Sequence, residues 1–121
     1  MAEGNAERLM TVNEVVKIAG VSKRTLQYYD SIGILPAQKR TETGYRLFGE
    51  KSIETLKKIG HYKSMGFELK EIKKILYTDG YDIVGALRRK REQLKMEYDI
   101  TGEKLRKVEE AIKDFLDIDV T

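Results

Sequence analysis

Apolar residues occur along the chain in short groups at helical spacing, separated by breaks that contain glycine or proline. In the first group, residues 12–19, the valine, isoleucine and alanine side chains share one face, which predicts a helix of about two turns. Thr11 and Glu14 match a capping box at its start, in which each side chain bonds the backbone of the other residue. Gly20 is expected to end this helix.

A second helix is predicted to follow almost immediately. Ser22 is a suitable N-cap, and Gly33 suits the left-handed position after the helix end. Leu26 and Tyr29 fall on the side expected to pack on the first helix, whereas other side chains face solvent or DNA: Lys23, Arg24, Gln27 and Tyr28. Two helices joined by a turn that contains glycine are typical of the helix-turn-helix motif.

A β-hairpin is predicted after this second helix. Pro36, the only proline, cannot continue the helix, and residues 38–48 hold two short extended runs around the turn 41–44. Tyr45 and Arg46 are expected at the hairpin tip. A basic helix followed directly by a basic hairpin presents hydrogen-bond donors to a duplex at two neighbouring places. We therefore predict that residues 22–48 read DNA.

Two more helices are predicted beyond the hairpin. The third spans residues 50–65 and contains Gly60, which costs about 1 kcal/mol relative to alanine and so indicates close packing or function at that point. The fourth begins after Phe67 and ends before the turn 78–80. The side chains expected to face inward are Ile53, Leu56, Ile59, Tyr62, Ile72, Ile75 and Leu76.

A different pattern begins at residue 82 and continues to residue 116. Successive seam positions are separated alternately by three and four residues, as in a coiled coil. They are Val84, Leu87, Arg91, Leu94, Tyr98, Thr101, Leu105, Val108, Ile112 and Phe115. A helix roughly 50 Å long is expected to bury this seam against a second copy of the chain, with Arg91 and Thr101 fixing the register. The alternative is a helix folded back on its own domain.

Composition excludes several classes of protein. The 121 residues include no cysteine and one histidine, so disulfides and thiolate metal sites are excluded, and no metal or cofactor is expected. No apolar run approaches about 18 residues and no signal-peptide core is present, so we expect a cytoplasmic protein without membrane contact. Paired carboxylates, phosphate loops and nucleophile motifs are absent. We expect no enzyme activity, and interpret Asp30 and Glu42 as solvated charges.

Charge is distributed unevenly between the two halves of the chain. Residues 11–66 hold ten basic and five acidic residues, whereas residues 81–121 hold nine and ten. This imbalance, modest enough to arise by chance, indicates a polyanion-binding unit joined to an interaction unit. We therefore predict an N-terminal extension that is disordered (1–10), a DNA-binding domain (11–80) and a dimerisation helix with a short tail (81–121).

In the order in which they occur, several stretches resemble the MerR family of bacterial transcription regulators. They are residues 12–22, 25–30 (TLQYYD), 33–36 (GILP), 44–46 (GYR), 63–67 (KSMGF) and 71–72. The resemblance implies a mainly α fold: a winged helix-turn-helix domain with a small β-hairpin wing, then a long coiled-coil helix. It also implies a winglike helix pair at 50–76 and an antiparallel homodimer, a direction that heptad spacing did not show.

The resemblance also implies particular DNA contacts. Recognition-helix positions are occupied by Ser22, Arg24, Gln27 and Tyr28, with Lys23 beside them; Arg40, Tyr45 and Arg46 occupy the wing, and Lys63 a phosphate-contacting position. Gln27 stands where the family usually has arginine, which affects base preference or a phosphate contact. Glu68 stands where a small hydroxyl residue usually caps the fourth helix.

The function implied is that of a regulator that binds promoter DNA as a homodimer and distorts it to control RNA polymerase. Effectors of the family normally bind beyond the coiled coil, where this chain has only residues 117–121. We expect either the front part of a longer regulator with a small-molecule-binding region or a short regulator. The alternatives are an architectural, excisionase-like DNA binder and a protein whose coiled coil is the active part.

Overall fold

The computed structural model describes residues 8–120, with side chains described for residues 8–117. The chain divides into two compact units, Met1–Tyr81 and Asp82–Thr121. Most of the N-terminal extension, residues 1–7, lies outside the described residues.

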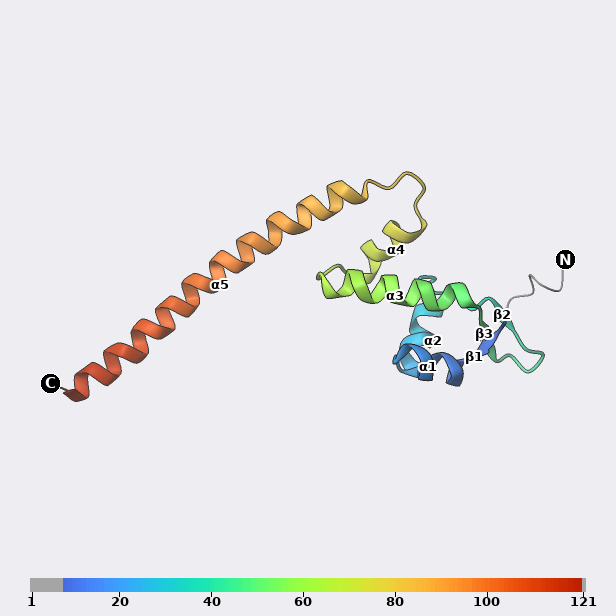
Figure 1. Cartoon of the computed structure of the whole chain (residues 1–121), viewed down its shortest axis with the longest axis horizontal. Helices are drawn as coiled ribbons and strands as arrows, with labels where there is room; N and C mark the ends of the chain where they lie inside the picture. Colours follow the sequence, from blue (N-terminus) through green and yellow to red (C-terminus); the bar gives the residue numbers. More distant parts are fainter. Residues whose placement is uncertain (1–7, 121) are drawn as a thin grey trace. The chain divides into compact units, whose positions relative to one another are not determined.

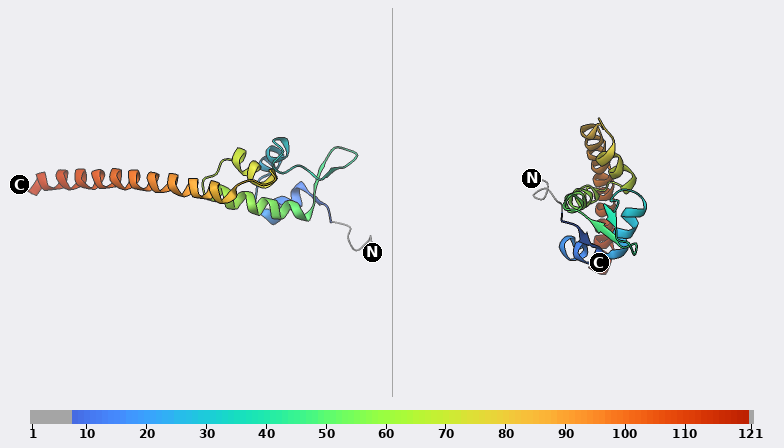
Figure 2. Two further views of the ribbon diagram at one scale, coloured as in Figure 1. Left: turned by 90° about the horizontal axis from the view of Figure 1, so that it is seen from above. Right: turned by 90° about the vertical axis from the view of Figure 1, so that its right-hand side faces the viewer.

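The first unit combines four helices with a small sheet (Figure 1). Its elements are β1 (Met10–Thr11), α1 (Val12–Ala19), α2 (Lys23–Ser31), β2 (Lys39–Arg40), β3 (Arg46–Phe48), α3 (Glu50–Ser64) and α4 (Leu69–Tyr77). The three strands are antiparallel in the order β1-β3-β2. Helix α1 packs against α2, α3 and β3, as the views in Figure 2 show. The mainly α fold with a hairpin wing is confirmed.

Local capping signals determine the helix-turn-helix. The Glu14 N–H donates to Thr11 Oγ1 at 3.2 Å, and the Thr11 N–H donates to Glu14 Oε1 at 3.1 Å, so the capping box is confirmed. Ser22 caps α2 by accepting the N–H of Thr25 at 3.0 Å. Gly20 ends α1 with φ 69°, a left-handed conformation that a side chain would strain. The two helices are thereby joined by a turn of three residues, 20–22.

The hairpin is also confirmed, but the sheet is larger than predicted. A turn closed by Gly44 N–H donating to the Thr41 carbonyl at 2.9 Å joins β2 to β3. The third strand, β1, was not predicted, because Met10 was assigned to a disordered extension. Met10 instead pairs with Phe48 and its side chain is buried. The ordered domain therefore begins before Thr11.

The core of the first unit draws residues from its four helices, from β1 and β3, and from the connection after α2. Six large side chains are fully buried: Val15, Leu26, Ile34, Phe48, Ile59 and Ile72. The predicted burial of Tyr29 is confirmed as well. Close packing at Gly60 is not observed, because a Cβ there would meet nothing within 4 Å. Glu68 makes no side-chain cap bond at the start of α4, as its departure from a hydroxyl residue suggested.

The second unit is one unbroken helix, α5 (Ile83–Val120), of 38 residues. At 1.5 Å per residue it is about 57 Å long. Asp82 caps its start, because its Oδ1 accepts the Gly85 N–H at 3.0 Å. Within the described residues, none of the helices is both long and apolar enough to cross a membrane.

Candidate nucleic-acid interface

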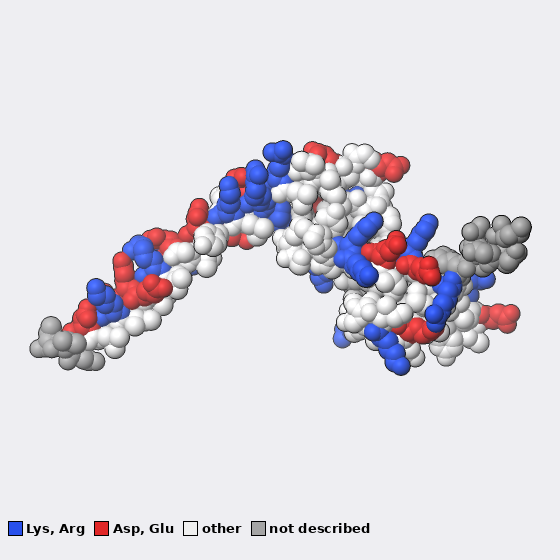
Figure 3. Space-filling model, in the orientation of Figure 1, with Lys and Arg blue, Asp and Glu red and all other residues white. Residues whose placement is uncertain are grey.

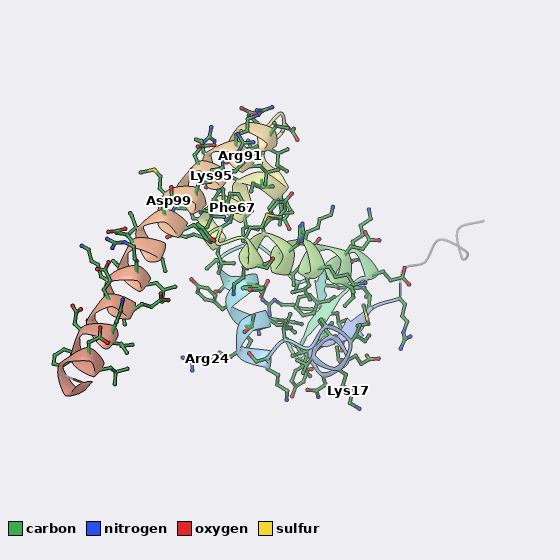
Figure 4. The ribbon with its side chains drawn as sticks, turned by 60° about the vertical axis from the view of Figure 1, so that its left-hand side comes forward. Lys17, Arg24, Phe67, Arg91, Lys95 and Asp99 are labelled. Carbon is green, nitrogen blue, oxygen red and sulfur yellow. The ribbon has the colours of Figure 1, made fainter. Side chains whose placement is uncertain are left out.

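Helix α2 has one buried face and one exposed polar face. Leu26 and Tyr29 are buried in the core, whereas the exposed side chains are Lys23, Arg24, Gln27 and Tyr28. The Arg24 side chain points away from the body of the domain (Figure 4). An exposed helix of this kind is about the size that the major groove of B-DNA admits, and its arginine and glutamine are residue types that bond base edges.

The start of α2 borders a groove of about 530 Å³ whose other wall is α3. Ser22, Lys63 and Gly60 line it, and a smaller adjoining hollow is lined by Arg24 and Tyr28 together with Ser22 and Lys63. The fold therefore brings Lys63 to the recognition helix from some 40 residues away in sequence. The open space at Gly60 leaves the helix backbone accessible from this groove.

The wing differs in detail from the sequence-based prediction. Tyr45 is 73% exposed beside the turn, in agreement with a position at the tip. The expectation that Arg46 shares the tip is wrong, because Arg46 lies in β3, paired with Arg40 of β2, and its side chain is only 27% exposed.

Asp30, in the last turn of α2, explains the position of both arginines. Its Oδ2 accepts from Arg46 Nε at 2.6 Å and from Arg40 Nη2 at 2.8 Å, while Oδ1 accepts the Ala37 N–H at 2.8 Å. Its side chain is 10% exposed, so the interpretation of Asp30 as a solvated charge is wrong. Burial by itself would raise the pKa of Asp30, but the bonds from Arg46 and Ala37 and the charges of Arg46 and Arg40 together lower it.

This pKa shift makes the contribution of Asp30 to stability depend on pH. Because the pKa is lower in the folded chain, ionised Asp30 stabilises the fold above its ordinary pKa of 3.8, and the contribution disappears as pH falls through the folded value. The melting temperature of Asp30→Asn should therefore lie below that of the parent above about pH 5, and the gap should narrow below pH 3.8. Circular dichroism melts at a series of pH values test this. A gap of constant size at all pH values would contradict it.

Several exposed lysines were not included in the predicted site, and Lys17 and Lys39 are two of them. Lys17, in the last turn of α1, and Lys39 of β2 both lie at the surface of the first unit. Lys17 and Arg24 extend outward from neighbouring helices (Figure 4). Sequence alone gave no way to select them, because exposed lysines are common on any solvated surface. Among the described residues, no three histidine or acidic side chains form a group that could hold a metal ion.

The predicted seam of α5 is exposed in the single chain. The exposed fractions of its large apolar side chains range from 37% for Leu87 to 79% for Tyr98. The others are Val84, Leu94, Leu105, Val108, Ile112 and Phe115. The two polar seam residues, Arg91 and Thr101, are exposed as well. Basic side chains gather on the first turns of α5, and acidic and basic side chains alternate farther along it (Figure 3).

These features define a winged helix-turn-helix DNA-binding protein with a long helix attached. The chain belongs to the MerR HTH family of regulatory proteins, whose family model matches residues 10–79. It is therefore a DNA-binding transcription regulator. The family resemblance noted in the sequence is confirmed.

Similar proteins extend this assignment. The HTH-type transcriptional activator mta of Bacillus subtilis is 41% identical over 83 residues, which are 69% of this chain and 32% of mta. The structure of its N-terminal part has a TM-score of 0.78 at 34% identity and covers 85% of this chain and 97% of that one. The B. subtilis regulator YfmP is 31% identical over 88% of this chain and 82% of its own length. HiNmlR, a MerR-family regulator lacking the sensor domain and bound to promoter DNA, has a TM-score of 0.60 at 25% identity, covering 87% and 88%.

This chain thus spans about a third of mta but most of YfmP and HiNmlR.

Proposed function

We propose that the chain binds a promoter operator as a homodimer and distorts the duplex so that RNA polymerase can act on it. The observation that carries the proposal is the exposed polar face of α2, which lies next to the wing in a domain with its own buried apolar core. The relative HiNmlR, which was solved on promoter DNA, supports the same mode for this chain. Specificity then arises both from base contacts and from the sequence dependence of distortion.

Base reading is assigned to Arg24 and Gln27, which lie one helical turn apart on the exposed face of α2. An arginine can bond guanine bidentately and a glutamine can bond adenine in the same way. The remaining contacts position the protein on the phosphates. They are assigned to Ser22, Lys23, Tyr28, Arg40, Tyr45, Arg46 and Lys63.

The homodimer is inferred from the exposed seam of α5. A row of large apolar side chains along a helix of 38 residues is stable in water when a second surface covers it. A second copy supplies a matching surface. Two DNA-binding units are also needed for the usual affinity of a winged domain for a roughly palindromic site.

Charge favours an antiparallel pairing of the two helices. If Leu94 packs against Leu105 of the second copy, every seam position meets another seam position, and Tyr98 meets Thr101. In that register Arg88 lies beside Glu109 of the second copy. A parallel pair would instead place Arg91 against its own copy in the seam, where like charges repel.

This register predicts the result of exchanging charges. Arg88→Glu and Glu109→Arg should each weaken self-association about five- to thirtyfold, because each change turns two attractive pairs per dimer into two repulsive ones. A mixture of the two variants should form a heterodimer, in which both pairs are attractive again. Sedimentation equilibrium and native mass spectrometry measure these states. A parallel dimer predicts unchanged self-association for Arg88→Glu.

The experiment that tests the proposed function combines selection and transcription. The parent chain is first used to select its operator from a library of random duplexes, and the selected site is then placed between promoter elements of varied spacing. Transcription by bacterial RNA polymerase should change in the presence of the chain, with the largest change where the elements are spaced too far apart. Binding without any change in transcription would contradict control of the polymerase. For a full-length protein with further residues, we propose that a small-molecule effector acts through that additional region.

A further inference from the structure

One carboxylate connects the recognition helix to three points of the wing segment. Asp30 accepts from Ala37, which follows Pro36 at the entry to the hairpin, and from one arginine on each hairpin strand. These arginines, Arg40 and Arg46, are direct partners across the β2–β3 ladder. All three contacts are 2.6–2.8 Å long and centred on a side chain that is largely withdrawn from water.

Strand β3 of the wing is attached to the domain through β1 and α1, but strand β2 has few attachments of its own that could fix its angle to α2. Strand β2 has only two residues and pairs with β3 alone, and isolated pairings this short are marginal in water. Between α2 and β2, the backbone bonds run from Ile34 and Leu35 back to the Tyr29 carbonyl, before the chain reaches Pro36. The contacts of Asp30 are therefore the main restraint on the free edge of the wing.

The helix end that carries Asp30 is itself held from the opposite side. Lys73 Nζ of α4 donates to the Ile32 carbonyl at 2.7 Å, and Tyr77 Oη donates to the Ile34 carbonyl at 2.7 Å. The first bond satisfies the carbonyl of the C-cap residue of α2, the second holds the chain just beyond the helix, and the lysine charge complements the negative end of the helix dipole. The end of α2 that carries Asp30 is therefore held in place by α4. The hydrogen bonds of Asp30 in turn hold the wing in place relative to α2.

The geometry also orients Arg46 toward a possible phosphate. Asp30 accepts a hydrogen bond from Nε of Arg46. The two terminal nitrogens of Arg46 make no hydrogen bond to any other of the described residues. A guanidinium held at Nε presents its remaining donors in a fixed direction, which suits bidentate bonding to a phosphate. Two arginines around one carboxylate leave a net positive charge on this part of the wing.

We propose that Asp30 is a positioning residue that sets the distance and angle between the recognition helix and the wing, so that both can contact one duplex at the same time. The proposal rests on the proposed DNA-binding function. Asp30 acts through Arg40 and Arg46 and not by touching DNA, because a carboxylate facing phosphates would be repelled.

Asp30→Asn provides the test, since an amide has one acceptor oxygen and cannot receive all three bonds. Affinity is measured by gel shift on the duplex that the parent selects from a random library and on an unrelated duplex of equal length. Affinity for the selected duplex should fall about tenfold or more. Affinity for the unrelated duplex should fall by a smaller factor, because no base contact there depends on the position of the wing and the removal of a negative charge near the phosphates offsets part of the loss. Hydroxyl-radical footprinting should show weaker protection on the wing side only.

The control is Glu42→Gln, which removes the same charge from the exposed turn of the wing without touching Arg40 or Arg46. The Glu42→Gln variant should bind both duplexes with unchanged or higher affinity. If Asp30→Asn is unfolded at the assay temperature, Asp30→Glu replaces it, because it keeps the charge but moves the carboxylate by one methylene. Equal losses on both duplexes, or full affinity for the selected one, would overturn the proposal. A parent that selects no sequence would instead refute the proposed function itself.

Discussion

Leu105→Glu is expected to give a monomer whose affinity for the operator falls to that for unrelated DNA. Leu105 is 57% exposed in the single chain and lies in the middle of the α5 seam. Each buried leucine contributes about 2 kcal/mol, and two copies are lost per dimer, so association should weaken at least about a thousandfold. The glutamate adds a further cost, since it would be desolvated without a partner.

Analytical ultracentrifugation and gel-shift titration of the same samples measure this effect. Met96→Glu is the matched control, because Met96 is 66% exposed on the face of α5 opposite the seam. That variant should remain dimeric and keep its affinity. Circular dichroism should show that the first unit stays folded in both variants. A Leu105→Glu chain that is monomeric but binds the operator as tightly as the parent would exclude the dimer mechanism.

The helix boundaries were predictable because their signals are local. Thr11 with Glu14, and Ser22 with the backbone three residues later, satisfy N–H groups that any helix start leaves unpaired. Gly20 and Gly33 adopt left-handed conformations that other residues avoid. Such signals act over three or four residues and can therefore be recognised in a sequence without knowledge of the fold.

The features that were missed depend on contacts between distant residues. Met10 forms a strand only because Phe48, 38 positions later, supplies its partner. Asp30 appears in the sequence as one acidic residue in a basic stretch, and only the folded hairpin brings Arg46 to it across 16 positions.

For the long helix too, features set within one helix are predictable from sequence, whereas features that depend on a partner are not. Alternating spacings of three and four residues identify the seam from Val84 to Phe115 because the period is a property of one helix. The direction of the partner depends on which charges meet between two chains, and the period carries no information on this. The charges that flank the seam carry information on this direction. For that reason, exchanging the charges of Arg88 and Glu109 distinguishes an antiparallel from a parallel pair.

Arg24→Ala is expected to cost about 1–3 kcal/mol on the operator and to relax its preference at one base pair. Arg24 projects from the exposed face of α2, one turn from Gln27, where a guanidinium can reach a guanine edge in the major groove. Loss of a bidentate base contact penalises the matched base pair and leaves mismatched duplexes little affected. Gln27→Ala should behave similarly at a neighbouring base pair.

Lys63→Ala is the comparison, because Lys63 borders the groove beside α2 and is assigned to a phosphate. Its loss should weaken binding to all duplexes by a similar factor and reduce the salt slope by about one. Affinities of the parent and both variants are measured on the operator and on every single-base substitution of one half-site, at three salt concentrations. If Arg24→Ala weakens all of these duplexes equally and lowers the salt slope, Arg24 contacts a phosphate and sequence is read elsewhere on α2.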